Sequence, residues 1–342
     1  MTTISPDTIS ALLADNDCGR LETLARDAQR LTRQYFGRAI GLYTPLYLSN
    51  FCASHCTYCG FHSRHKITRA KLTADQMAAE MHAIAGLGPQ NILLLTGESP
   101  QATPLDYLLT AVEMAKKYFQ GIALEIYPML EDEYRTLYRA GADGVTIYQE
   151  TYDRARYAEV HLAGQKQDYN FRRGAPERIA KAGMRQISLG ALLGLGPLAT
   201  DLFDLYEHLR ELERKFPGVE YSLSFPRLRT IKAREFAASC VDDTTFVKIL
   251  CLTRLLFPRV GINLSTRETM AVRNRLLDIC VTRISIGSKT SVGGYLDQGP
   301  SGDPQFDVAD DRSAADMILY LKAHGFDPVF TDWRRIDNKG PA

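Results

Sequence analysis

The sequence predicts an α/β fold: a (β/α)8 barrel of the TIM type, preceded by a helical extension. Three observations predict it. Short apolar runs alternate with amphipathic stretches, eight of each can be counted, and polar residues follow most of the runs. Continuous apolar runs are typical of parallel strands that are covered on both faces. Eight strand–helix units close such a sheet into a barrel, and a doubly wound open sheet is the alternative.

Each element can be placed in chain order. The expected strands are Leu42–Leu48, Asn91–Leu95, Ile122–Tyr127, Gly144–Tyr148, Gln186–Leu192, Glu220–Phe225, Gly261–Leu264 and Arg283–Ile286. The expected helices are Thr73–Ala85, Asp106–Tyr118, Glu131–Arg139, Pro176–Ala182, Asp201–Lys215, Thr244–Phe257, Thr269–Leu277 and Ser313–His324. Thr73 followed by Gln76 has the pattern of a helix start, and Gly141 has that of a helix stop.

The chain divides into three parts in this interpretation: residues 1–40 as the helical extension, 41–335 as the barrel and 336–342 as a flexible tail. Its 41 Lys and Arg balance 40 Asp and Glu, a net charge of +1. This balance gives no electrostatic basis for binding nucleic acid or a membrane surface. No signal peptide is recognisable, and no apolar stretch approaches the roughly 20 residues that cross a bilayer. We therefore expect a soluble cytoplasmic protein.

Polar residues follow six of the eight expected strands. In a barrel, the active site lies at the carboxyl ends of the strands, on loops from several of them. One polar loop would carry no weight, because loops are polar in general, but six that meet at one rim indicate a site. In strand order these residues are the cysteines from Cys52, Thr96–Glu98, Gln149–Glu150, Arg227, Ser265–Glu268 and Ser288–Lys289.

Three of the seven cysteines fall within eight residues, with the spacing Cys52-x3-Cys56-x2-Cys59. An odd number of cysteines in a long chain does not fit a disulfide scaffold. Short runs of this kind hold iron–sulfur clusters. Three thiolates would leave one iron of a four-iron four-sulfur (4Fe-4S) cluster open to a small molecule. Zinc is the alternative, with His62 or His65 as an added ligand, but Cys52 would then be surplus and no second Cys-x2-Cys pair exists.

The cysteine spacing, with Tyr58 directly before the third cysteine, resembles the signature of radical S-adenosylmethionine (SAM) enzymes. The resemblance implies that the open iron binds the amino and carboxylate groups of SAM. It also implies that an electron from the cluster cleaves SAM into methionine and a 5′-deoxyadenosyl radical. Tyr58 is accordingly expected at the SAM site.

Other residues match the expected SAM contacts. Thr96-Gly97-Glu98 resembles the Gly-Gly-Glu element of the family, with Thr in place of the first Gly. In the family, the carbonyls and the carboxylate of this element contact the SAM amino group. Glu150 is placed to accept hydrogen bonds from the ribose hydroxyls. A guanidinium is the natural partner of the SAM carboxylate. Spacing alone does not decide among the three candidates for this role, Arg172, Arg173 and Arg178.

A narrower resemblance is to the 2-iminoacetate synthase family of tyrosine lyases. It implies cleavage of the Cα–Cβ bond of L-tyrosine, giving p-cresol and 2-iminoacetate (dehydroglycine) for the thiazole of thiamine. It also implies an electron donor protein and, as a partner, the thiazole synthase that uses the imine. The stretches that carry the resemblance run in the family's order through Tyr47–Asn50, Thr96–Glu98, Gly144–Tyr152, Leu189–Leu195, Ser224–Leu228, Leu264–Glu268, Gly287–Thr290 and Gly293–Tyr295.

An amino acid substrate needs its carboxylate held. Ser265 and Arg267 together offer a hydroxyl and a guanidinium fork, and both match the substrate-carboxylate positions of the family. Two residues apart, they would face the same side of an extended strand end. The alternative is that Arg267 pairs with Glu268 or with another acid at the rim.

Three other functions stay open. A lyase acting on tryptophan would use the same anchor. The hydrogenase-maturation tyrosine lyase adds a C-terminal domain with a second cysteine-bound cluster; since Cys280 is the last cysteine here, we expect no formation of carbon monoxide or cyanide. From a different class, a zinc-dependent barrel hydrolase or a structural metal-binding protein would also contain clustered cysteines.

Overall fold

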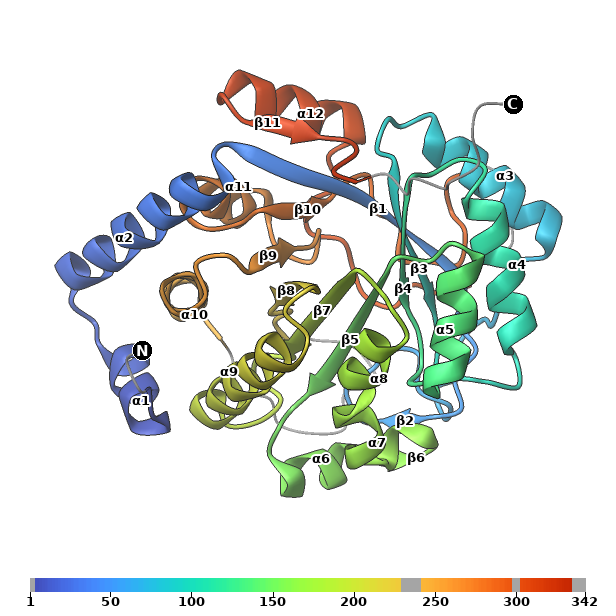
Figure 1. The fold of residues 1–342 in the computed structure, drawn as a ribbon, viewed down its shortest axis with the longest axis horizontal. Coiled ribbons are helices and arrows are strands. Elements are labelled where there is room, and N and C mark those ends of the chain that lie inside the picture. The colour runs from blue at the N-terminus through green and yellow to red at the C-terminus, as the bar shows by residue number, and fades with distance from the viewer. Residues whose placement is uncertain (1–3, 229–240, 297–301, 334–342) are drawn as a thin grey trace.

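The computed structural model describes residues 4–228, 241–296 and 302–333, and in this part of the chain eight parallel strands close into a barrel (Figure 1). Strand β1 (Ala39–Ser49) pairs with β3 (Asn91–Thr96) and also with the last barrel strand, β10 (Arg283–Ser285), where Gly41 lies opposite Arg283. This second pairing closes the ring and confirms the predicted fold class. The strands between are β4 (Gly121–Glu125), β5 (Gly144–Glu150), β7 (Gln186–Ala191), β8 (Glu220–Ser224) and β9 (Gly261–Leu264).

The expected helices surround the barrel. Thr73 accepts a hydrogen bond from the Gln76 backbone and Gln76 accepts one from the Thr73 backbone, which forms the predicted capping box. Gly141 ends its helix at a φ of 135°. The barrel helices are α3 (Ala74–Ala85), α4 (Leu105–Ala115), α5 (Glu131–Ala140), α8 (Ala175–Lys181), α9 (Leu198–Lys215), α10 (Asp243–Leu256), α11 (Met270–Ile279) and α12 (Ala314–Ala323).

The N-terminal segment is helical, with α1 (Pro6–Ala14) packed against α9 and α2 (Cys18–Phe36) packed against α10 and α11. The proposed division at residue 40 falls inside β1. The proposed end of the barrel at residue 335 and the tail at 336–342 lie outside the described residues. No helix among the described residues is long and apolar enough to cross a membrane.

Several short elements were not predicted, because segments of two to seven residues are too short to show a periodic pattern. Two of them, β2 and β6, pair with each other in an antiparallel sheet beside the barrel. A third, β11, pairs with the first residues of β1. The unpredicted elements are β2 (His55–Cys56), α6 (Arg154–Val160), β6 (His161–Ala163), a 3-10 turn at Gln165–Gln167, α7 (Tyr169–Arg173) and β11 (Asp327–Val329).

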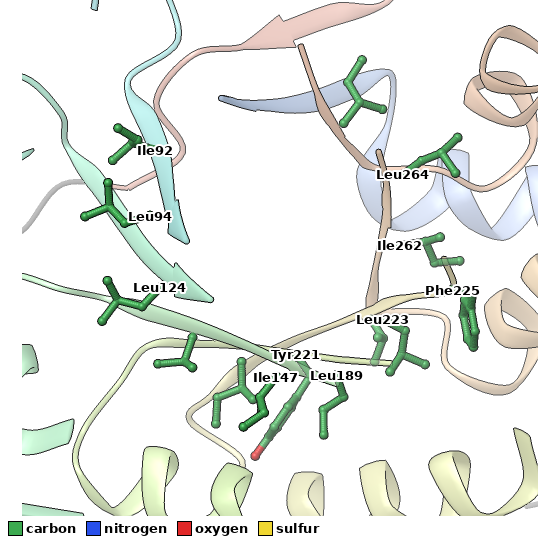
Figure 2. Close-up of a cluster of buried hydrophobic side chains, with 14 of the residues drawn as sticks. Ile92, Leu94, Leu124, Ile147, Leu189, Tyr221, Leu223, Phe225, Ile262 and Leu264 are labelled. Carbon is green, nitrogen blue, oxygen red and sulfur yellow. The ribbon is translucent and has the colours of Figure 1, made fainter. Parts of the chain in front are cut away.

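The hydrophobic core lies between the strands and the helices. Figure 2 shows Leu94, Leu124 and Leu189 pointing away from the middle of the barrel, toward the surrounding helices. Successive side chains of a strand point to opposite faces, so the residues directly before and after each of these leucines face the interior of the barrel. On β4, Leu124 therefore lies in the core, whereas Glu125 lines the cavity inside the barrel.

Asp201, in the first turn of α9, ties this helix to the end of β5. Its carboxylate accepts hydrogen bonds from Thr151 Oγ1 (2.8 Å) and the Tyr152 backbone (2.6 Å). Burial raises its pKa to about 6, above the ordinary value of 3.8. A folded-state pKa above the unfolded one gives stability that is complete below pH 3.8 and is lost as the pH rises through 6.

We therefore expect Asp201→Asn, which cannot ionise, to become more stable relative to the natural chain as the pH rises from 4 to 7. The relative gain is at most about 3 kcal/mol, since one pKa unit corresponds to about 1.4 kcal/mol. Denaturant unfolding of both proteins across this range measures it. Asp307→Asn, in an exposed loop, is the control, and parallel stability curves for Asp201→Asn and the natural chain would contradict the expectation.

Candidate active site

A cavity of about 150 Å³ lies inside the barrel, at the carboxyl ends of the strands. Five of the site residues predicted from the sequence line it, although they come from three different loops and strand ends. Glu125 and Lys166, which were not predicted, line it as well. The five predicted residues are Tyr58, Cys59, Glu150, Ser265 and Arg267.

The cysteine loop follows β1 and is held from two sides. The Ala53 backbone donates a hydrogen bond to the Glu98 carbonyl (2.8 Å), and Cys56, in β2, pairs with β6. The backbone N–H of Phe61 points at Cys59 Sγ, at 3.4 Å. The loop is thus bound to the segments that follow β3 and β5, which places its cysteines at the rim of the barrel.

Two glycines allow this close approach. A Cβ on Gly97 would lie 2.4 Å from the Phe51 carbonyl oxygen, and one on Gly164 would lie 2.6 Å from Ser54 Cα. Gly164 also has a φ of +84°, which favours glycine over other residues. The glycine of Thr96-Gly97-Glu98 is therefore explained by packing against the cysteine loop.

Burial raises the pKa of all three thiols, that of Cys52 to about 11. Reactive cysteines have lowered pKa values, so these are not activated nucleophiles, and a bound metal would favour their thiolate forms. Within the described ranges, no three His, Cys, Asp or Glu side chains gather around the position of one metal ion. A cluster bonds each thiolate to a different iron, so its ligands do not have to meet at one point.

Four charged side chains form a buried network beside the cysteine loop. Glu98 Oε1 accepts from Arg172 Nη1 (2.8 Å) and lies 3.4 Å from Lys166 Nζ. Lys166 Nζ also donates to Glu150 Oε1 (2.7 Å). Burial alone would raise the pKa of Glu98, but Arg172 and Lys166 outweigh it and lower that pKa. The network therefore holds two cations and two carboxylates at the ends of β3 and β5.

The second oxygen of Glu98 is available to a ligand. Glu98 Oε2 is buried and has no hydrogen-bond partner among the residues that the structure describes, and the same is true of Thr96 Oγ1. A buried acceptor without a partner is costly unless a bound molecule satisfies it. An ammonium group beside the cysteine loop would do so, and this fits the predicted contact between Thr96-Gly97-Glu98 and the amino group of SAM.

The structure separates the three candidate arginines. Arg172 lies in the network and also donates to the Tyr148 carbonyl (2.6 Å). Arg173 pairs with Glu211, and Arg178 donates to backbone carbonyls outside the network. Lys166, in a short turn without any recognisable motif, is the second cation of the network and was missed. Of the three arginines, only Arg172 joins the network, with Lys166 beside it, and its contact with the SAM carboxylate stays a prediction.

Glu150 has a strained backbone, with a φ of +73°. This left-handed conformation costs roughly 1–2 kcal/mol for a residue other than glycine. It occurs where the register of β5 against β7 shifts, between Tyr148 and Glu150. The shift lets the carboxylate reach Lys166. Its predicted contact with the ribose hydroxyls stays a prediction.

Tyr58 is fixed by the segment that follows β5. Its hydroxyl lies 2.9 Å from His161 Nε2, and His161 Nδ1 lies 2.8 Å from the Tyr157 carbonyl. Burial and Lys166 lower the pKa of His161 to about 2, so its ring is neutral. Nδ1–H therefore donates to the carbonyl, and Nε2 accepts from Tyr58.

Ser265 and Arg267 both line the cavity, as predicted, but they lie in a turn after β9 rather than on an extended strand end. The Arg267 guanidinium lies over the Phe306 ring, 3.8 Å from its centre. Burial lowers the pKa of Arg267, yet arginine stays protonated at neutral pH. Glu268, the acid considered as its partner, forms two hydrogen bonds with Arg227.

Comparisons with known proteins identify the family of this chain. The chain matches the model of the Radical SAM superfamily over residues 46–218 and that of the Biotin and Thiamin Synthesis associated domain over residues 224–327. It is 41% identical over 331 residues to 2-iminoacetate synthase of Escherichia coli (strain K12), covering 96% of this chain and 88% of that protein. The chain belongs to the 2-iminoacetate synthase family.

Two further relatives are similar to this chain over nearly its whole length. 2-iminoacetate synthase of Salmonella typhimurium is 39% identical over 96% of this chain and 88% of its own length. Among solved structures, HydG, a maturase of the [FeFe]-hydrogenase, aligns with a TM-score of 0.90 and 30% identity, covering 96% of this chain and 73% of that one. The superfamily's cofactors are a 4Fe-4S cluster and SAM, so the family match favours the cluster over the zinc site considered from the sequence.

Replacing Glu98 with glutamine should weaken SAM binding about tenfold to a hundredfold, because a charge-assisted hydrogen bond to the SAM ammonium would be lost. Equilibrium dialysis of the reconstituted protein with SAM measures the change. Glu177→Gln, which alters an exposed ion pair with Lys181 and Lys215, is the control. An unchanged affinity for SAM in Glu98→Gln would exclude the contact.

Proposed function

We propose that this chain is a radical SAM lyase that cleaves the Cα–Cβ bond of L-tyrosine to 2-iminoacetate and p-cresol, for the thiazole of thiamine. One observation carries the proposal: a single cavity joins Cys59, from the cysteine loop, to Ser265 and Arg267, the proposed carboxylate anchor. The relatives named 2-iminoacetate synthase support this reaction over cleavage of tryptophan.

The geometry supports the following roles for the side chains. Cys52, Cys56 and Cys59 hold the cluster, which together with SAM supplies one-electron chemistry when bound. The network of Glu98, Glu150, Lys166 and Arg172 holds the polar groups of SAM with fixed charges. Arg267 and Ser265 bind the substrate carboxylate through a fork and a hydroxyl. Tyrosines and leucines line the cavity, and their rings and aliphatic side chains exclude water from the reacting groups.

The decisive experiment mixes the anaerobically reconstituted protein with SAM, a chemical reductant and L-tyrosine. We expect 5′-deoxyadenosine, p-cresol and glyoxylate, the product of 2-iminoacetate and water. A reaction without reductant is the control. Formation of deoxyadenosine without p-cresol would contradict the assignment of tyrosine as the substrate. The absence of both products would contradict the radical chemistry.

Two protein partners belong to the proposal. A cluster that gives an electron to SAM must be reduced again from outside the chain, so we propose an electron donor protein. The imine product reacts with water, so we propose direct use by the thiazole synthase. Adding that enzyme should lower the glyoxylate released for each p-cresol formed, and an unchanged ratio would argue against a direct transfer.

A further inference from the structure

Glu125 faces the cavity from the wall opposite Arg267. It is the last residue of β4, and Arg267 follows β9. In the ring β1-β3-β4-β5-β7-β8-β9-β10, three strands separate β4 from β9 in either direction. A ligand whose carboxylate is held at the β9 wall therefore extends its other end toward β4.

Glu125 has a carboxyl that the described residues do not satisfy. It forms neither a hydrogen bond nor an ion pair within the described part of the chain. Burial, followed by the charge of Glu150, raises its pKa to about 7, although Arg267, Lys166 and Arg172 act in the opposite direction. The Glu125 side chain is only partly buried, because it faces the cavity, and an acid with a perturbed pKa that lines a cavity is a candidate for binding a ligand.

The surroundings of Glu125 suit an aromatic ring. Tyr43, Tyr47 and Tyr148 line the same cavity, together with Leu93 and Leu95. Burial raises the pKa of Tyr43 to about 12, and the negative charge of Glu125 is the next cause. The same two causes, in the same order, raise the pKa of Tyr47 and of Tyr148. Glu125 thus shares its part of the cavity with aromatic rings and aliphatic side chains.

We propose that Glu125 binds the phenolic hydroxyl of the substrate tyrosine and so selects a phenol over an unsubstituted ring. This inference rests on the proposed function. The carboxylate and the amino group share one carbon, so both stay at the Arg267 wall, whereas the phenol oxygen lies at the far end of the molecule. A site built to bond a hydroxyl rejects an analogue that lacks it, because its own polar group is then left without a partner.

The test measures the affinities for L-tyrosine and L-phenylalanine by titration calorimetry, on the reconstituted protein with SAM and without reductant, so that no turnover occurs. The natural chain should bind tyrosine about tenfold to a hundredfold more tightly than phenylalanine. In Glu125→Leu this preference should disappear, because tyrosine loses affinity, whereas phenylalanine, which no longer leaves a carboxyl without a partner, loses none. Glu125→Gln, of nearly the same shape and still able to bond a hydroxyl, should keep part of it.

A second ligand separates the two ends of the substrate. p-Cresol carries the phenol but neither the amino group nor the carboxylate, so its affinity should fall in Glu125→Leu as much as that of tyrosine. An equal loss for tyrosine and phenylalanine, with p-cresol unaffected, would place Glu125 at the amino group and overturn the proposal. Unchanged affinities for all three ligands would overturn it as well.

Failure here is distinguishable from failure of the proposed function. Binding of tyrosine, phenylalanine and p-cresol is measured without catalysis, whereas the function is tested by release of p-cresol from tyrosine under reduction. A chain that prefers tyrosine through Glu125 but forms no p-cresol would refute the reaction alone. A chain that forms p-cresol with an unaltered ligand preference in Glu125→Leu would refute only the role of Glu125.

Discussion

Cys59→Ser should abolish the iron–sulfur cluster, and with it the formation of p-cresol, while leaving the barrel folded. Cys59 is the cysteine of the triad that lines the cavity, and its replacement leaves two thiolates for a cluster that the family holds with three. Serine preserves the shape of the side chain but is a far poorer ligand for iron. Iron and acid-labile sulfide per chain, measured after anaerobic reconstitution, should fall to a small fraction of the natural value.

Cys18→Ser is the matched control for this substitution. Cys18 is exposed at the start of α2, far along the chain from the cysteine loop, and its replacement should change neither the iron content nor the p-cresol yield. Circular dichroism of both variants shows whether the barrel is intact. A full complement of iron and sulfide in Cys59→Ser would mean that the cluster has other ligands.

The barrel could be predicted because its strands carry continuous apolar runs. The expected strand Asn91–Leu95 is β3 to within one residue, and Gly261–Leu264 is β9 as predicted. These strands are apolar at consecutive positions because both of their faces are buried. By contrast, β2 and β6 pair across more than a hundred residues and contain only two and three residues each. Nothing local in such a segment distinguishes it from a loop.

The candidate site was predictable only where its chemistry is local in sequence. Three cysteines within eight residues indicate a metal cluster. The charge network, by contrast, joins Glu98 to Arg172, which are 74 positions apart, so no local pattern predicts it. Lys166 was missed because a lone lysine in a turn has no distinguishing neighbour. Glu125 lay inside an expected strand, and only closure of the barrel shows that it faces a cavity instead of solvent.

Strand-end geometry was a further limit. Ser265 and Arg267 were expected to share a face because alternate residues of an extended strand do so. The strand in fact ends at Leu264, and a turn presents both side chains to the cavity. Both residues thus face one cavity, but through a different local conformation from the one predicted, since a turn over four residues can also bring positions two apart to one side.

Arg267→Lys should weaken the binding of L-tyrosine about tenfold to a hundredfold and leave the binding of SAM unchanged. The guanidinium lies over the Phe306 ring, 3.8 Å from its centre, and Arg267 lines the cavity. Lysine keeps the positive charge but cannot form two parallel hydrogen bonds. Titration calorimetry with tyrosine and equilibrium dialysis with SAM measure the two affinities on the same reconstituted protein.

Tyramine makes this prediction specific to the carboxylate. It has the phenol and the amino group of tyrosine but no carboxylate, so its affinity should be the same in Arg267→Lys as in the natural chain. Arg173→Lys, in a partly exposed pair with Glu211, controls for the loss of any guanidinium. Burial lowers the pKa of Arg267 because its charge is costly inside the protein, and a bound carboxylate would offset that cost. If tyrosine, tyramine and SAM all lost affinity by one factor, Arg267 would be shaping the cavity rather than binding the substrate.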